Sequence, residues 1–238
     1  MLFRSTAALA EKARGTLPPG VLGLPVIESV LPEVEDIVGA AEALLGLASD
    51  LGSVDVRVPL ADGRMVSGTV PGIGGDHQRV IAYSRVNPRQ RLAAWVRLLV
   101  LSAAYPERGF TVATVGRGRK RGRRVTLARL APLDRATAHE ALEELIALYD
   151  EGLREPLPIY SDTTAAYVEA VANDGRPRKA GADKWESGRF DGEGREPEHV
   201  LVLGGEPSFE AVLADGRFAA LAHRLWDRLL AHEHLEDR

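Results

Sequence analysis

The sequence predicts an α/β (α+β) fold in which a mixed β-sheet is flanked by helices, and three observations predict it. Strand-like segments follow one another between residues 54 and 85, joined by an Asp-Gly turn and a glycine-rich turn. A strongly amphipathic helical pattern comes next. A further pair of strand-like segments and more helical patterns follow it. This order favours helices packed on a sheet over an all-helical or an all-β protein.

The bulk composition is that of an ordinary globular protein of 238 residues, with 45% apolar and 27% charged residues. The absence of cysteine excludes disulfides, thiol catalysis and cysteine-ligated metal sites. The apolar run at 92–105 contains Arg97 and is too short to span a bilayer. Arg4, Glu11 and Arg14 interrupt any signal-peptide core. We therefore predict a cytoplasmic protein.

One domain is expected over residues 1–238. Its expected parts are a helical lead-in at 1–47, an α/β core at 48–172, a polar loop at 173–200, and a strand with a C-terminal helix at 201–238. In the lead-in, Pro18 and Pro19 divide the helical pattern, and the second helix is expected from Pro32 to Leu47.

The core is expected to begin with an antiparallel three-strand meander, from the alternating segments 54–60, 65–70 and 79–85. A helix then starts at Pro88, with Trp95 on its apolar stripe and in the core.

A second strand pair, "FTVATV" and "RVTLARL" (124–130), encloses a basic loop, "RGRKRGRR" (117–124). A long helix follows from about Thr137 to Leu153, where Thr137 and Glu140 form a capping box.

The C-terminal part is expected to hold a short helix, "TTAAYVEAVA", and then a long polar loop at 173–199 anchored by Trp185 and Phe190. The apolar segment "HVLVLGG" favours a strand, and the last amphipathic segment favours a helix that frays around Glu233.

Positive charge is concentrated in one part of the chain, although the net charge is −4. Between Arg85 and Arg124 there are eleven Lys or Arg residues and a single acid, Glu107. Such charge separation favours a polyanionic partner over a merely solvated loop, because phosphate contacts gain affinity from counterion release. The predicted DNA-binding residues are Arg85, Arg89, Arg117, Arg119, Lys120, Arg121, Arg123 and Arg124. An acidic protein surface is the rival partner.

The glycine-turn hairpin, "GTVPGIGGDHQRVIAYSR", lacks the groups that metal-dependent phosphodiester cleavage needs. That chemistry requires hard oxygen ligands converging on Mg²⁺ and a cation near the phosphate. Nucleases often place these groups on two adjacent strands, at positions that here hold Pro71, Ala82 and Ser84. We therefore predict no catalytic residue, no metal site and no cofactor. Without a GxxxxGK[ST] loop, ATP hydrolysis is not expected either.

Several segments, taken in order, resemble the C-terminal part of RecC, the gamma subunit of exodeoxyribonuclease V (the RecBCD helicase–nuclease). They are "VSGTVPGI", "LAAWVRLLVLSA", "EALEELIALYDEGLREPLPI" followed by "AAYVEA", "WESGRFDGEGREPEHVLVLGG" and "FAALAHRLWDRLLAHE". The likeness runs through most of the chain from about residue 50 onward. The basic loop matches no motif of this family, so its role is inferred from charge alone.

The resemblance implies a restriction-endonuclease-like, PD-(D/E)XK core whose catalytic acids and lysine are absent, at Pro71, Ala82 and Ser84. It also implies a subunit that neither cuts DNA nor hydrolyses ATP itself. In this family the subunit scaffolds the RecB-like beta and RecD-like alpha subunits, helps to split duplex DNA ends for double-strand-break repair by recombination, and takes part in recognising the Chi sequence. No Chi-reading residue can be transferred to this chain.

Three functional hypotheses follow. The first is a non-catalytic DNA-binding and scaffold domain that holds duplex or forked DNA. The second is an active metal-dependent nuclease with atypical ligands such as Asp55, Asp62 or Asp76. The third is a pure subunit-interaction module whose basic face docks an acidic partner.

Overall fold

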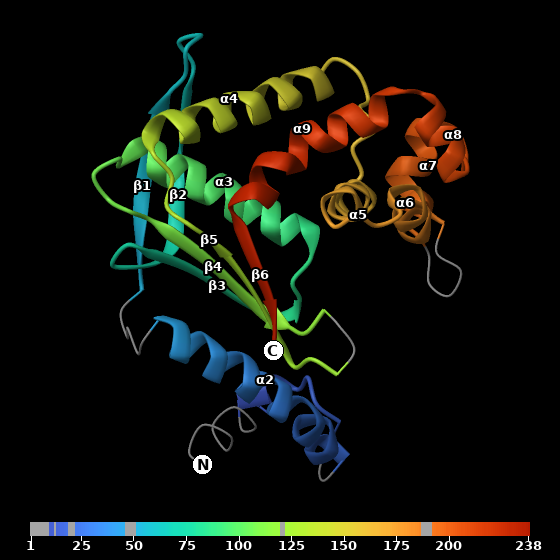
Figure 1. Ribbon diagram of the computed structural model, residues 1–238. Coiled ribbons are helices and arrows are strands. Elements are labelled where there is room, and N and C mark those ends of the chain that lie inside the picture. The colour runs from blue at the N-terminus through green and yellow to red at the C-terminus, as the bar shows by residue number, and fades with distance from the viewer. Residues whose placement is uncertain (1–9, 12, 19–21, 46–50, 120–121, 187–191) are drawn as a thin grey trace.

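In the computed structural model, helices lie on both faces of a mixed β-sheet (Figure 1). The structure describes residues 10–11, 13–18, 22–45, 51–119, 122–186 and 192–238. Within these residues the sheet has six strands in the order β1-β2-β3-β4-β5-β6. The predicted mixed sheet flanked by helices is therefore confirmed.

The predicted meander forms the first half of the sheet. Strands β1 (Gly52–Pro59), β2 (Met65–Gly74) and β3 (His77–Arg85) pair antiparallel, and β4 (Thr111–Arg117) then lies parallel to β3. Parallel neighbours need a crossover connection, which here is α3 (Pro88–Ala104). The sheet continues antiparallel through β5 (Val125–Leu130) and β6 (Glu233–Asp237).

The main core lies between the sheet and the helices on its upper face in Figure 1. These helices are α3, α4 (Arg135–Gly152) and α9 (Arg217–His232). Helix α3 starts where expected, because Asn87 and Gln90 form a capping box around Pro88. Trp95 on α3 is 1% exposed, so its predicted core position is confirmed.

The lower face of the sheet is covered by α2 (Gly23–Leu45), which contacts β3, β4 and β5 (Figure 1). The expected helix start at Pro32 is wrong, because α2 runs through both Pro25 and Pro32. Pro25 falls in the first turn, where a missing N–H costs nothing. Pro32 lies on the exposed side, where water can bond to the carbonyl that the proline leaves unpaired. The expected end at Leu47 falls outside the described residues.

The start of α4 differs from the expected capping box of Thr137 and Glu140. Asp134 is the N-cap, and its carboxylate accepts a hydrogen bond from the Thr137 backbone N–H at 2.9 Å. Aspartate caps helices as well as threonine does, and the earlier residue is used here.

The polar segment 173–200 is not the long loop that was expected. After α5 (Ser161–Ala172) it contains α6 (Pro177–Trp185) and the 3₁₀ turn η2 (Glu193–Arg195), and α7 (Pro197–Leu203) begins within it. The expected strand over "HVLVLGG" is therefore wrong. Pro177 and Pro197 start helices, and Gly204 ends α7 with a left-handed φ of 70°. The last short helix before α9 is α8 (Phe209–Ala214).

Two anchors were expected for this segment. Trp185 is 2% exposed and does fill the core, while Phe190 lies outside the described residues.

The end of the chain is also different from the expected frayed helix. Helix α9 stops at His232, and residues Glu233–Asp237 form β6 on the edge of the sheet. The expectation failed because the segment EHLED has a single apolar residue, so it shows no alternation of apolar and polar residues that would predict a strand.

Candidate nucleic-acid interface

Most of the predicted DNA-binding cations lie at one end of the sheet. Arg85 ends β3 and is the register partner of Arg117, which ends β4. The basic loop joins β4 to β5 at this same end, and Arg89 lies in the first turn of α3, just after β3. Lys120 and Arg121 fall outside the described residues.

Acids on α2 pair with two cations of the basic loop. Arg117 donates to Glu33 at 3.1 Å, and Arg124 donates to Asp36 at 3.2 Å. The Arg117 guanidinium also lies 4.8 Å from the centroid of the Tyr83 ring. Exposed pairs of this kind are worth little to stability and exchange readily for another anion.

Glu33 on α2 accepts hydrogen bonds from two residues of the sheet, Tyr83 and Arg117. The Tyr83 hydroxyl donates to its carboxylate at 2.8 Å. This bond, the bond from Arg117 and the nearby charge of Arg85 hold the pKa of Glu33 below its usual value. Glu33 is therefore ionised at neutral pH and pairs with Arg117 as a carboxylate.

Two further predicted cations contact the helices beside the sheet. Arg89 donates to Glu196 at 3.0 Å, and Arg119 donates to Glu169 at 3.3 Å. Arg85 and Arg123 are exposed, and neither has an ion pair within the described part of the chain. Charge density in the sequence located these cations, and the structure shows which of them have acidic partners among the described residues.

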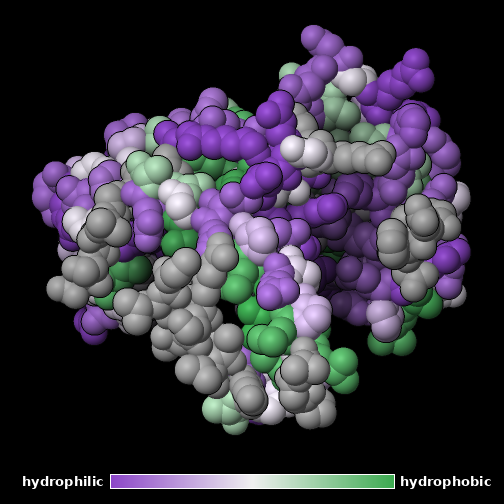
Figure 2. All heavy atoms as spheres, turned by 90° about the horizontal axis from the view of Figure 1, so that it is seen from below, coloured by the Kyte–Doolittle hydropathy of each residue, from purple (hydrophilic) through white to green (hydrophobic). Residues whose placement is uncertain are grey.

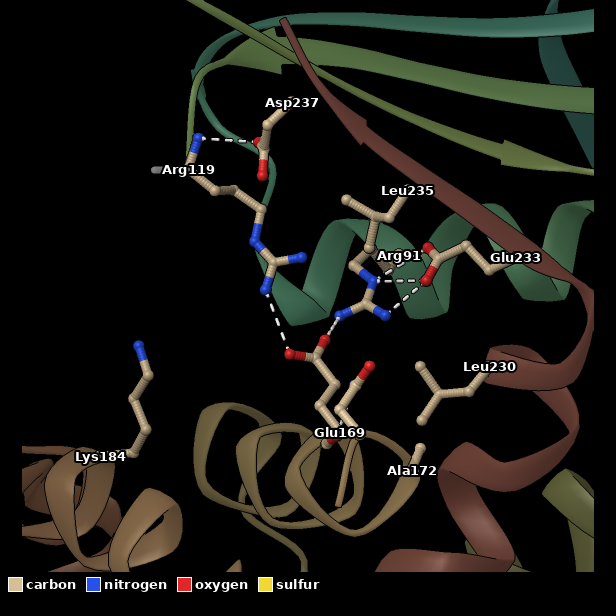
Figure 3. Close-up of a pocket in the computed structure, with 10 residues that line it drawn as sticks. Arg91, Arg119, Glu169, Ala172, Lys184, Leu230, Glu233, Leu235 and Asp237 are labelled. Atoms are coloured by element: carbon tan, nitrogen blue, oxygen red, sulfur yellow. Dashed lines mark hydrogen bonds and ion pairs between the residues drawn. The ribbon is translucent and has the colours of Figure 1, made fainter. Parts of the chain in front are cut away.

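A cavity of about 670 Å³ lies beside this end of the sheet (Figure 3). Arg119 and Lys184 border it on one side, and Leu230 and Leu235 on the other (Figure 3). A smaller hollow shares Arg119 and Lys184 with it and is also lined by Arg85. The cavity and the cationic end are thus continuous. Seen from below, the surface is largely hydrophilic and hollowed beside an apolar stripe (Figure 2).

Arg91 forms the buried floor of this cavity. It is 1% exposed, so it is not part of the exposed basic surface. Its Nε donates to both carboxylate oxygens of Glu233, at 2.9 and 3.0 Å, and its terminal nitrogens bond Glu233 and Glu169. Burial lowers the pKa of Arg91, but the two carboxylates outweigh burial and leave the pKa raised. No sequence signal pairs Arg91 with an acid so far along the chain.

The positions expected for nuclease acids and lysine are occupied by uncharged residues. Strands β2 and β3 pair only where Ile73 and Gly74 meet Gln78 and His77, and they diverge beyond that point. Pro71 on β2 is exposed, while on β3 Ala82 is half-buried and Ser84 is exposed.

The three alternative nuclease ligands lie apart, each with its own partner. Asp55 on β1 accepts from Thr69 at 2.6 Å. Asp62, in the turn before β2, accepts from Arg64 at 2.6 Å, and Asp76, in the turn after β2, accepts from Arg108 at 2.7 Å.

A strand of β2's length separates its two ends by roughly 30 Å, so Asp62 and Asp76 cannot share one ion. In the described residues, no three His, Cys, Asp or Glu side chains cluster in a way that could hold a metal.

Comparison with known proteins places the chain in a family. The RecC C-terminal domain family matches residues 3–172. The chain belongs to this family. The RecBCD enzyme subunit RecC of Mycobacterium tuberculosis is 35% identical over 244 residues, which cover 98% of this chain and 22% of that protein. The same subunit of Mycolicibacterium smegmatis is 34% identical over 240 residues, or 96% of this chain and 22% of that protein.

This RecC C-terminal domain chain thus spans only 22% of the length of the relatives it matches. Among the helices that the structure describes, none has the length and apolar character needed to cross a membrane.

Proposed function

We propose that this RecC C-terminal domain is a non-catalytic DNA-binding and scaffold domain of a RecBCD enzyme. In this proposal it holds duplex or forked DNA near the point of strand separation during double-strand-break repair by recombination. The cations at the end of the sheet contact DNA phosphates without reading sequence. The chemistry of DNA cleavage and ATP hydrolysis belongs to other subunits, RecB and RecD.

The observation that carries the proposal is the meeting of separate cationic segments at one end of the sheet. Arg85, Arg89 and the basic loop are far apart in sequence, but β3 and β4 bring them together. Arg85 and Arg123 are exposed and unpaired in the described residues, so they can bind phosphate at once. Arg117 and Arg124 have exposed acidic partners that phosphate can displace.

A restriction-endonuclease-like core is part of the same proposal. Strands β1, β2 and β3 form the kind of antiparallel meander from which such a core presents its metal ligands, and helices lie on both faces of the sheet, which supports this part of the proposal. Pro71, Ala82 and Ser84 stand where its acids and lysine would be. A nuclease scaffold without its metal ligands keeps a surface shaped for DNA while losing the reaction.

Single charge reversals test the proposal, because the structure distinguishes unpaired from paired cations. Arg123→Glu should weaken binding of a fluorescent duplex several-fold, since it removes a free phosphate contact and adds repulsion. Arg57→Glu on β1 is the matched control, because Arg57 is exposed and distant from the basic loop in the sheet. Equal affinities for wild type, Arg123→Glu and Arg57→Glu would refute the proposed DNA contact.

Two rivals have their own tests. Metal-dependent turnover of linear DNA by the chain, lost on Asp55→Ala, Asp62→Ala or Asp76→Ala, would favour an active nuclease. A chain that co-purifies with RecB and RecD yet binds no DNA would favour a pure interaction module.

A further inference from the structure

Within the described residues, strand β6 forms an open edge of the sheet. It pairs with β5 on one side, and the sheet order ends with it. Arg238 N–H donates to the Val125 carbonyl at 2.8 Å, and Val125 N–H donates back to Arg238 at 3.2 Å. Hydrogen-bonded pairs alternate along an antiparallel ladder. Arg238, Glu236 and His234 therefore bond to β5, and the residues between them, Asp237, Leu235 and Glu233, direct their backbone N–H and C=O away from β5.

The outward-facing backbone groups of β6 are accessible. Leu235 is half-buried as a whole, and its N–H points away from β5, on the side where the described residues add no further strand. The Glu233 side chain is 3% exposed, but the residue as a whole is partly exposed. The exposed atoms of Glu233 are therefore mainly those of its backbone. An open strand edge of this kind is a template for another strand.

The same residues that present their backbone outward also line the cavity. Glu233, Leu235 and Asp237 from β6 form one wall, and α5 and α6 contribute the opposite side (Figure 3). A strand added to β6 would therefore place alternate side chains into the cavity. Leu230 and Leu235 offer it an apolar contact, and the ammonium group of Lys184 offers it a cation.

We propose that the β6 edge binds an extended segment of a partner polypeptide as a seventh strand. The segment carries an apolar side chain for Leu230 and Leu235, and a carboxylate on the same face for Lys184. Main-chain hydrogen bonds supply affinity, and the cavity supplies specificity. This inference deepens the scaffold part of the proposed function and rests on it, because it names the surface that a partner subunit contacts.

The charge of the cavity favours a polypeptide over a nucleic acid strand. Its ionisable lining consists of three cations and three carboxylates: Arg91, Arg119, Lys184, Glu169, Glu233 and Asp237. Phosphates passing along this wall would meet carboxylates as often as cations, which gives no net electrostatic attraction. A peptide backbone can form hydrogen bonds with the outward N–H and C=O groups of β6. Its alternating side chains can also include groups that pair with either the cations or the carboxylates of the cavity.

Overlapping synthetic peptides that tile the RecB and RecD subunits of the same organism provide the probe. Peptides that bind the full chain should show the alternating apolar and acidic pattern. Leu235→Pro should weaken their binding roughly tenfold or more, because proline removes an outward N–H and leaves the bonds to β5 in place. Leu235→Ala is the matched control, since it trims the side chain but keeps the N–H, and it should weaken binding less.

Hydrogen exchange provides a second readout that needs no variant. The Leu235 amide should exchange fast in the free chain and slowly with a bound peptide. The proposal is overturned if no peptide binds, if Leu235→Pro binds the peptides as well as wild type does, or if the amide stays unprotected. A dimer in sedimentation that Leu235→Pro disrupts would assign the edge to a second copy instead. Duplex binding by Leu235→Pro, measured in parallel, should be unchanged, so loss of the peptide site and loss of the DNA site are distinguishable.

Discussion

The guanidinium of Arg91 on α3 is buried against the carboxylate of Glu233, 142 residues further along the chain at the start of β6. Arg91 is 1% exposed and the Glu233 side chain 3% exposed, so water can replace neither partner. Removing Glu233 leaves the buried guanidinium with the more exposed Glu169 as its remaining carboxylate partner among the described residues. This ion pair therefore fixes the last strand to the core.

Glu233→Ala should lower the free energy of unfolding by roughly 3–5 kcal/mol in urea denaturation. The double variant Arg91→Met/Glu233→Leu should recover most of that loss, since an apolar pair carries no desolvation cost. Glu198→Ala on α7, an exposed glutamate, is the control and should change stability little. A loss for Glu233→Ala as small as that of the control would show that the pair does not hold β6.

A second long-range contact caps α5. Tyr160 at its N-cap makes no side-chain cap bond. Instead Glu193, 7% exposed, accepts from the backbone N–H groups of Asp162 and Thr163 at 3.0 and 2.7 Å. Glu193→Ala should lower the free energy of unfolding by about 1–2 kcal/mol, as loss of an N-cap does. Glu193→Gln keeps an acceptor and should lose less. Equal losses for the two variants in urea would argue against the capping role.

The glycine after Glu193 is required by close packing. A Cβ on Gly194 would lie 2.5 Å from a ring carbon of Trp185, which is 2% exposed. Gly194→Ala should therefore cost about 1–3 kcal/mol, because the ring must shift within a packed core. Gly39→Ala on α2 is the matched control, since its Cβ would meet nothing within 4 Å. Thermal unfolding of both variants measures the difference, and similar melting temperatures would contradict the predicted clash.

Asp162 makes stability depend on pH in a defined direction. Burial raises its pKa, and the nearby charge of Glu193 raises it further. A raised folded-state pKa means that the ionised carboxylate opposes folding at neutral pH, and that this cost disappears as pH falls through the folded pKa towards the unfolded one.

Asp162→Asn should therefore be more stable than wild type at neutral pH, because the amide carries no charge that burial and Glu193 disfavour. The advantage should vanish at acidic pH. Urea denaturation of both proteins at several pH values measures this difference in stability. A difference that does not change with pH would refute the raised pKa of Asp162.

The parts of the fold that sequence predicted are those whose signal is local. The alternation in 54–60 and the Asp-Gly turn specify β1 and β2, and Pro88 with its capping box specifies the start of α3. The parts that it missed depend on distant partners. β6 exists because β5 offers an edge and Arg91 holds Glu233, and no local pattern encodes either fact.

The same distinction applies to the candidate interface. Charge density located the basic loop, and the strand order then placed Arg85 next to it. Sequence could not show that Arg117 and Arg124 meet acids of α2, because those acids precede the loop by more than 80 residues. Nor could it show that Arg91 is buried, since its helical position is equally typical of an arginine lying over an apolar stripe.

The proposed function depends on binding of DNA phosphates by the cations at the end of the sheet. The salt dependence of DNA binding tests this most directly. The logarithm of the binding constant for forked, blunt and single-stranded DNA is measured against the logarithm of salt concentration. The slope for duplex should become shallower by roughly 0.9 for each phosphate contact removed in Arg85→Glu/Arg123→Glu. An identical slope for wild type and this double variant would contradict the claim.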